Sequence, residues 1–202
     1  MTPSGLPVCS CCGARLPGAF DAVVECSACR TARPVFDMAR APWLYAGAAQ
    51  EAVKQFKYHG RWRLGRRLAQ DMAKAARASF PLDDVAAVVP VPLHWLKRRL
   101  RGFNSVEQLA RTVAGSLKKS YASSALQRTR WTVTQTRLGS RQRVRNVHRA
   151  FAARTRLVDG KTVLLIDDVL TSGATANACA LALKDAGARA VFVLTAARTP
   201  LA

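Results

Sequence analysis

Apolar positions along the chain follow two spacings, which predict helices and buried strands in turn. Apolar residues recur at helical spacing in four segments: 48–57, 64–78, 105–117 and 175–186. Continuous apolar runs rich in β-branched residues predict three strands: 85–91, 162–166 and 190–195. A shorter strand is expected over 121–126. Because strands and helices alternate, the pattern predicts an α/β fold built on a parallel sheet.

The first 34 residues lack this periodicity and contain five of the six cysteines of the chain. Cys9 and Cys12 form one C-x-x-C pair, Cys26 and Cys29 form a second, and 13 residues separate the two pairs. Such pairs can present four thiolates tetrahedrally to Zn²⁺. The spacing therefore predicts a structural zinc ribbon over 1–34 and a second domain over 35–202. A redox-active pair and incidental cysteines are the alternatives.

Other residues around these pairs bear on the zinc hypothesis. Cys11 could compete with its neighbours for the metal or remain a free thiol. Three basic side chains near the pairs are expected to offset the negative charge of a zinc–thiolate centre: Arg15, Arg30 and Arg33. Cys179 stands alone on a predicted buried helix face and is interpreted as a small core residue.

Residues Val163 to Thr175 combine an apolar strand, an acidic pair, a Thr/Ser/Gly turn and the start of a helix. The carboxylates of Asp167 and Asp168 come at the carboxyl end of the strand, where open α/β sheets bind ligands. Backbone N–H groups at the start of the helix suit a phosphate. The turn residues that would supply these groups and three hydroxyls are Thr171, Ser172, Gly173, Ala174 and Thr175. The alternative is an ordinary capped helix with the two acids as turn residues.

This stretch resembles the phosphoribosyl pyrophosphate signature of type I phosphoribosyltransferases. More widely, the chain resembles the ComF/GntX family, which combines such a domain with an N-terminal cysteine-pair ribbon. The further segments that carry this resemblance are 56–60 (FKYHG), 89–92 (VPVP), 101–104 (RGFN), 134–136 (TQT), Arg143 and Asn146.

The resemblance implies a twisted parallel sheet flanked by helices, with a small zinc ribbon at the N-terminus. It also implies that residues 171–175 hold the 5′-phosphate of phosphoribosyl pyrophosphate, while Asp167 and Asp168 hold the ribose hydroxyls and help to hold Mg²⁺ that enters with the ligand. Basic residues of two loops would bind its pyrophosphate: Arg98, Arg99, Arg101, Arg141 and Arg143. The zinc ribbon and residues 35–60 are the candidates for selecting an acceptor.

Charge adds a second line of inference. The chain carries 32 Lys and Arg against 12 Asp and Glu, for a net charge of +20. Residues 96–156 contain sixteen of the basic residues and a single acid, Glu107. Such a field attracts polyanions. The aromatic residues among these charges, which could stack on the bases of single-stranded DNA, are Trp95, Phe103, Tyr121 and Trp131. Compositional bias with ordinary core aromatics is the alternative.

Two functions remain open at the level of sequence. The first is a Mg²⁺-dependent phosphoribosyltransferase-like protein linked to competence and DNA uptake. The second is a non-catalytic adaptor that keeps the phosphoribosyl site for binding or sensing and contacts single-stranded DNA, a DNA-uptake helicase or other competence proteins. His59, His94 and His148 have no catalytic partner in the sequence. No apolar run reaches the length of a membrane helix and no signal peptide is evident, so a cytoplasmic location is expected.

Overall fold

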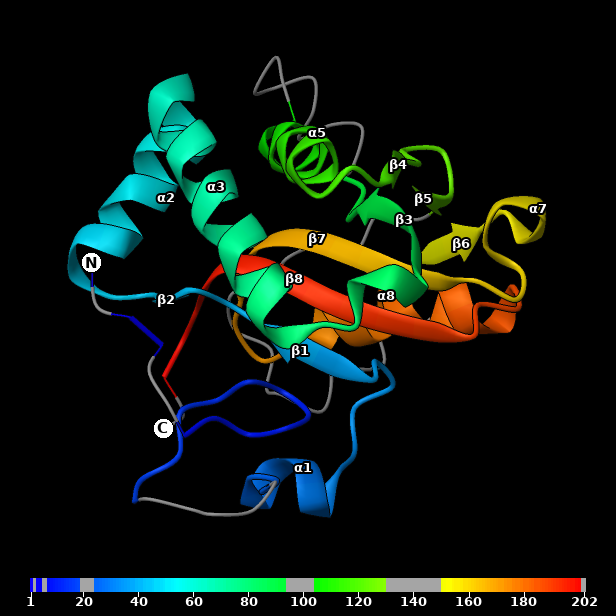
Figure 1. Ribbon diagram of the computed structural model, residues 1–202, viewed down its shortest axis with the longest axis horizontal. Coiled ribbons are helices and arrows are strands. Elements are labelled where there is room, and N and C mark those ends of the chain that lie inside the picture. The colour runs from blue at the N-terminus through cyan, green and yellow to red at the C-terminus, as the bar shows by residue number, and fades with distance from the viewer. Residues whose placement is uncertain (2, 5–6, 19–23, 94–103, 130–149, 201–202) are drawn as a thin grey trace.

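A computed structural model describes residues 1, 3–4, 7–18, 24–93, 104–129 and 150–200 (Figure 1). Its helices are α1 (Ser27–Thr31), α2 (Gly47–His59), α3 (Trp62–Ser79), α5 (Ser105–Leu117), α7 (Thr155–Val158) and α8 (Ala174–Asp185), with a 3-10 turn η1 (Leu82–Asp84). Its strands are β1 (Met38–Arg40), β2 (Trp43–Leu44), β3 (Val85–Pro90), β4 (Ser120–Tyr121), β5 (Leu126–Arg128), β6 (Phe151–Ala153), β7 (Thr162–Leu170) and β8 (Ala190–Arg198). Within these ranges, no helix is both long and apolar enough to span a bilayer.

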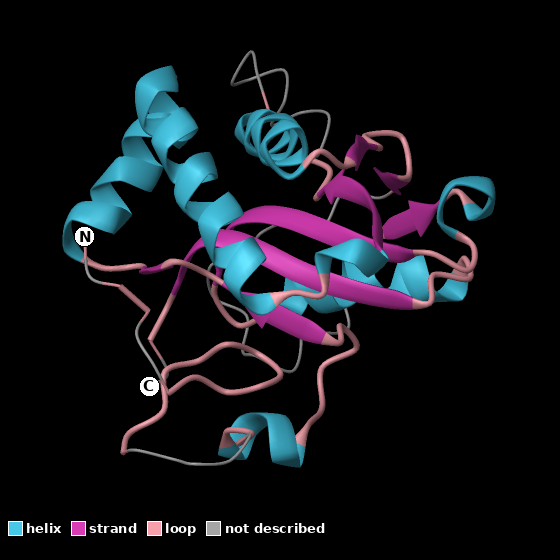
Figure 2. Cartoon of the chain, viewed as in Figure 1, coloured by secondary structure: helices cyan, strands magenta, loops and turns pink. Residues whose placement is uncertain are grey.

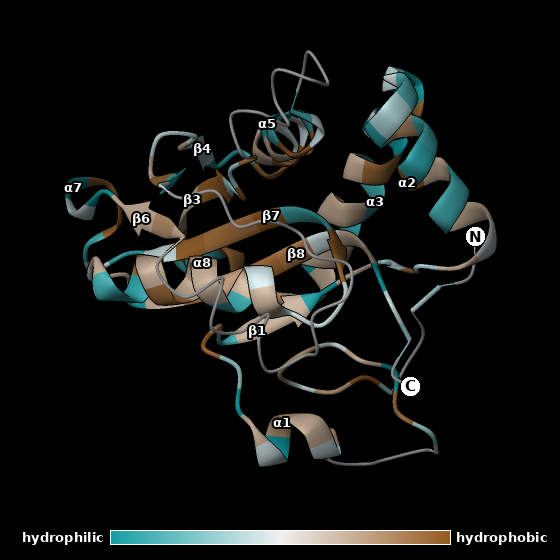
Figure 3. Ribbon diagram, turned by 180° about the vertical axis from the view of Figure 1, so that it is seen from behind, coloured by the Kyte–Doolittle hydropathy of each residue, from teal (hydrophilic) through white to brown (hydrophobic). Residues whose placement is uncertain are grey.

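The strands form a six-stranded sheet in the order β1-β8-β7-β3-β4, with β2 continuing the pairing along β8. Every pair in this sheet is parallel, as the sequence predicts, whereas β5 and β6 form a separate antiparallel pair. Helices α3 and α5 cover one face and α8 covers the other (Figures 1 and 2). Burial on both faces explains why β7 and β8 are almost continuously apolar (Figure 3).

Three strand predictions need correction, of which the simplest is the strand predicted over 190–195, since β8 continues to Arg198. The predicted strand over 162–166 does not end at Ile166, because β8 continues to pair with β7 as far as the Leu170–Arg198 pair. Asp167 and Asp168 therefore lie within the strand and point to opposite faces. The strand predicted over 121–126 is wrong: β4 ends at Tyr121, and a turn separates it from β5. The apolar side chains at the two ends of this segment belong to two different sheets.

Helix α5 begins at a side-chain cap. Asn104 is the N-cap, and its side-chain oxygen accepts a hydrogen bond from the backbone N–H of Val106 at 3.1 Å. Its amide nitrogen donates to Glu107 Oε1 at 3.1 Å. These bonds fix the start of α5, whose Val106 lies on the wall of the site described below.

The cysteine-rich segment lies against the edge of the sheet at β1. The backbone N–H of Ala39 donates to the carbonyl of Cys11 at 2.7 Å. Gly13 has a φ of 68°, and a Cβ atom at this position would stand 2.4 Å from the carbonyl oxygen of Ala39. Only glycine allows so close an approach, which is how the first cysteine pair is held on the sheet.

Candidate functional site

Because the strands are parallel, their carboxyl ends meet along one edge of the sheet, and the candidate site lies at this edge. A cavity of about 300 Å³ opens there. Residues from five segments line it: Tyr45 and Lys57; Val91, Pro92 and Leu93; Val106; Arg128; and Asp167, Asp168, Val169, Thr171 and Thr175. The structure thus brings the acidic pair and part of the predicted phosphate-binding turn to one cavity.

The two carboxylates of the pair have different surroundings. Asp168 is almost fully buried, whereas Asp167 is half-buried and accepts a hydrogen bond from the backbone N–H of Asp168 at 2.8 Å. Burial, with a further contribution from the charge of Asp168, raises the pKa of Asp167 to about 7. Near neutral pH the Asp167 carboxyl therefore populates both its protonated and its charged form.

The turn after β7 has the conformation expected of an anion-binding helix start. Gly173 is the N-cap of α8, with a left-handed φ of 77° that favours glycine. Thr171, Ser172 and Thr175 are exposed beside it. The first N–H groups of a helix have no partner within the helix, and the helix dipole is positive at this end. The turn can therefore accept a phosphate.

Sequence reasoning missed the third charged member of this site, Lys57 of α2. Its Nζ lies 2.5 Å from Oδ2 of Asp168. Burial lowers the pKa of Lys57, but the charge and hydrogen bond of Asp168, together with the charge of Asp167, outweigh this and raise the pKa above its ordinary value. The sequence signal for this residue was the FKYHG segment (56–60), which contains Lys57. That segment supported the family resemblance, but the resemblance assigned no role to its lysine.

Helix packing explains how Lys57 reaches the carboxylate. Phe56, its neighbour on α2, is buried, and its ring lies against Gly65 of α3. A Cβ atom on Gly65 would stand 2.3 Å from this ring. The glycine therefore lets α2 and α3 approach closely, and the approach holds the last turn of α2 over the end of β7.

The five arginines predicted to bind pyrophosphate cannot be placed in the site. Arg98, Arg99 and Arg101 lie in 94–103, and Arg141 and Arg143 lie in 130–149, outside the described residues. The same holds for Trp95, Phe103 and Trp131. Of the four predicted stacking aromatics, Tyr121 is described, and the guanidinium of Arg111 lies over its ring at 4.5 Å.

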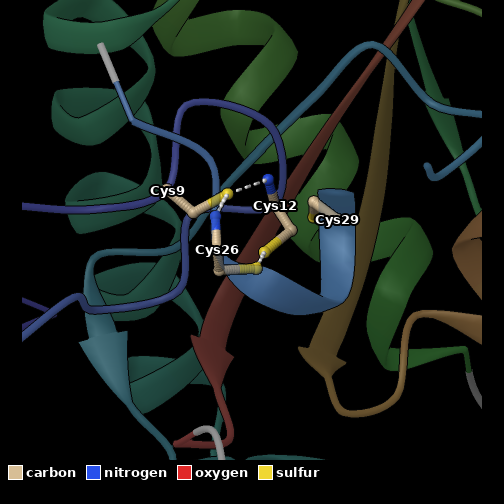
Figure 4. A group of neighbouring side chains, drawn as sticks. All are labelled: Cys9, Cys12, Cys26 and Cys29. Atoms are coloured by element: carbon tan, nitrogen blue, oxygen red, sulfur yellow. Dashed lines mark hydrogen bonds between the residues drawn. The ribbon is translucent and has the colours of Figure 1, made fainter. Parts of the chain in front are cut away.

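The second candidate site is the cysteine cluster (Figure 4). The sulfur atoms of Cys9, Cys12, Cys26 and Cys29 all lie within 4.8 Å of one another, and all four residues are buried. Cys12 and Cys26 have their sulfurs 3.7 Å apart. A tetrahedral zinc with Zn–S bonds of about 2.3 Å requires about 3.8 Å between sulfurs, so the four side chains fit a zinc ion. Cys11 is not a member of this group.

Two backbone N–H groups stabilise one sulfur of the cluster. The N–H groups of Cys12 and Cys26 donate to Sγ of Cys9 at 3.5 and 3.3 Å. Burial raises the pKa of Cys9, but such backbone hydrogen bonds lower it to about 7. Cys9 therefore ionises more readily than an ordinary thiol.

Two further arginines, which the sequence did not indicate, add positive charge beside the cluster. Arg15, Arg30 and Arg33 are exposed, and Arg33 pairs with Glu25 at 3.1 Å. Both of the further arginines come from the sheet: Nη1 of Arg40 donates to the carbonyl of Ser10 at 3.0 Å, and Nη1 of Arg198 donates to that of Cys12 at 2.5 Å. Distant segments of the chain therefore add counter-charge, which no local pattern shows.

Comparison with known proteins agrees with this architecture. The profile of the phosphoribosyl transferase domain family matches residues 65–200. The DNA utilization protein YhgH of Salmonella typhimurium is 32% identical over 196 residues, which are 95% of this chain and 84% of that protein. Competence protein F of Haemophilus influenzae is 26% identical over 197 residues, 95% of this chain and 85% of that protein.

A solved structure also resembles part of the chain. It is glutamine phosphoribosylpyrophosphate amidotransferase from B. subtilis complexed with ADP and GMP, with a TM-score of 0.47 and 20% identity. The match covers 70% of this chain but 30% of that one, so this chain spans less than a third of the solved protein.

Proposed function

Because the chain belongs to the phosphoribosyl transferase domain family, in the ComF group that contains competence protein F and YhgH, we propose that it binds phosphoribosyl pyrophosphate and acts in DNA uptake. The observation that carries the proposal is the single cavity shared by Asp167, Asp168 and the turn that opens α8. Backbone N–H groups of residues 171–175 hold the 5′-phosphate, and the two carboxylates accept hydrogen bonds from the ribose hydroxyls. The names of the relatives support the link to competence and DNA utilization.

A transfer reaction at this site needs no protein nucleophile. Pyrophosphate leaves the first carbon of the ribose as the bond to an acceptor forms, and the protein positions the groups and stabilises the developing charge. In this proposal the hydroxyls are oriented by Asp167 and Asp168, and arginines 98, 99, 101, 141 and 143 bind the leaving pyrophosphate. The cavity wall that would face an acceptor includes Tyr45, from the 35–60 segment.

The acidic pair does not fit a resident Mg²⁺ in the absence of the ligand. The ammonium of Lys57 already neutralises Asp168, and the raised pKa of Asp167 leaves little further negative charge for a cation. We therefore place Mg²⁺ with the incoming pyrophosphate group and derive no step through it. The ribbon over 1–34, with zinc on Cys9, Cys12, Cys26 and Cys29, remains part of the proposal as a structural domain preceding 35–202.

Calorimetry with phosphoribosyl pyrophosphate and Mg²⁺ tests the proposal. We expect one ligand per chain, with ribose 5-phosphate competing and ribose competing poorly because it lacks the phosphate group that α8 holds. Release of pyrophosphate in the presence of candidate acceptors would make the protein a transferase. Binding without turnover would instead favour the alternative, a sensor or adaptor that keeps the site. Absence of binding to the complete chain would refute the phosphoribosyl assignment.

A basic and aromatic corner between α2 and α3 favours single-stranded DNA as a second ligand. Tyr58 and Trp62 are 60% and 48% exposed, and arginines 61, 63 and 66 are exposed around them. Aromatic rings stack on bases without sequence preference, and arginines neutralise phosphates. This corner lies outside the 96–156 segment that the sequence singled out.

We expect Tyr58→Ala combined with Arg66→Ala to weaken binding of a single-stranded oligonucleotide about tenfold or more and to make its salt dependence less steep. Fluorescence anisotropy at several salt concentrations measures both effects. Lys161→Ala, at an exposed basic position just before β7 and outside residues 96–156, is the control. If the double variant binds as wild type does, the corner is not the DNA-binding surface.

A further inference from the structure

The ion pair between Lys57 and Asp168 places a cation on the wall of the proposed ligand site. Lys57 lines the same cavity as the acidic pair and the end of β3. The side chain of Lys57 is 25% exposed, so a ligand in the cavity can reach its ammonium group. The family profile begins at residue 65, so α2 adds this lysine from outside the matched domain.

The groups of this site lie on opposite faces of the sheet. Successive strand residues alternate in direction, so Asp168 points toward α2 while Asp167 points toward α8. The phosphate-binding turn leads into α8 on the second face, and α2 lies beside α3 on the first (Figure 1). Two positive regions, the start of α8 and Lys57, therefore stand on either side of an acidic pair.

This order of charges matches a sugar that carries an anionic group at each end. A ribose between the two carboxylates, with its 5′-phosphate at α8, directs its first carbon away from α8. The ammonium of Lys57 has three donors, and its printed partner is a single carboxylate oxygen, Oδ2 of Asp168, so Lys57 can donate to a second anion while Asp168 accepts from the ribose hydroxyls. The nearest anion that the proposed ligand offers is the pyrophosphate at the first carbon.

We propose that Lys57 is a ligand-binding residue that neutralises Asp168 in the empty site and binds the pyrophosphate group of the ligand in the loaded site. The inference rests on the proposed function and deepens it, because it makes α2 the element that distinguishes phosphoribosyl pyrophosphate from ribose 5-phosphate. Lys57 binds the group on the first carbon of the ribose, whereas the turn at α8 binds the 5′-phosphate.

The test compares the affinities of these two ligands in the complete protein by calorimetry with Mg²⁺. Lys57→Met should lower the affinity for phosphoribosyl pyrophosphate about ten- to a hundredfold, the size of one lost charged hydrogen bond, and change that for ribose 5-phosphate less than threefold. Lys57→Arg should recover most of the loss. Lys54→Met, on an exposed position one turn earlier in α2, should affect neither ligand.

Each other outcome has a definite meaning. An equal loss for both ligands in Lys57→Met would overturn the inference, because the lysine would then act only as a counter-ion that shapes the site. Unchanged affinities would overturn it as well. Should wild type bind neither ligand, the proposed function itself fails, and this result is distinct from the two others. Far-ultraviolet circular dichroism identifies a variant that does not fold, in which case Lys57→Gln replaces Lys57→Met.

Discussion

Replacing Asp167 and Asp168 together by Asn should weaken the binding of phosphoribosyl pyrophosphate by about ten- to a hundredfold for each carboxylate lost. The reason is that a hydrogen bond to a charged acceptor contributes about 1.5–3 kcal/mol, and an amide is a weaker acceptor for a ribose hydroxyl. Calorimetry with Mg²⁺ and competition with ribose 5-phosphate measure the change. Asp83→Asn, an exposed acid before β3 at the far end of the strand, is the matched control. A double variant that binds as tightly as wild type would remove the basis of the site assignment.

The two single variants separate binding from stability. Asp168→Asn leaves the ammonium of Lys57 without its carboxylate, so this variant should lose some stability as well as affinity. Asp167→Asn keeps that pair. Since the pKa of Asp167 is about 7 when folded and about 3.9 when unfolded, the folded chain binds more protons between these pH values. The free energy of unfolding of wild type should therefore fall as pH rises from 4 to 7. The fall should be smaller in Asp167→Asn, and urea titrations across this range measure it.

Loss of one zinc ligand should have the largest structural effect. We expect wild type to hold one Zn²⁺ per chain and Cys26→Ser to lose it, with residues 24–34 becoming unprotected against hydrogen exchange. Binding of structural zinc contributes about 10–16 kcal/mol in isolated zinc-finger peptides, as much as the whole stability of an ordinary domain. Elemental analysis gives the metal content, and mass spectrometry after exchange gives the protection.

Cys11 supplies the control within the same segment. Its sulfur is not among the four that converge, so Cys11→Ser should keep the zinc. Retention of zinc by Cys26→Ser, or a metal-free wild type whose N-terminal segment is fully protected, would exclude this site.

The parts of the site that were predictable are those encoded in one continuous segment. The apolar run, the acidic pair and the Thr/Ser/Gly turn follow one another in the chain, so a strand, its end and a helix start could be placed from them. The cysteine spacing was equally local. Lys57, Arg40 and Arg198 could not be found in this way, because their partners lie in distant segments that only the folded sheet brings together.

Strand limits failed for a related reason. The end of β7 is set by its pairing with β8, not by its own polarity, so two acids occur inside a strand. Strands β1 and β2 have three and two residues, too few to show a period, and exist because β8 offers them an edge. Helices α2, α3, α5 and α8, which are long enough to show several turns of the pattern, were placed correctly within a few residues.

The outer edge of β8, which β1 and β2 cover, would be exposed in a shortened form of the protein. Residues 38–40 and 43–44 satisfy the outer edge of β8, and all but the first of its nine residues are buried. A chain beginning at residue 65, where the family match starts, would keep the signature motif but leave this apolar edge open. Open apolar edges recruit strands from other molecules and lead to aggregation. The N-terminal quarter of the chain therefore also protects the protein against self-association.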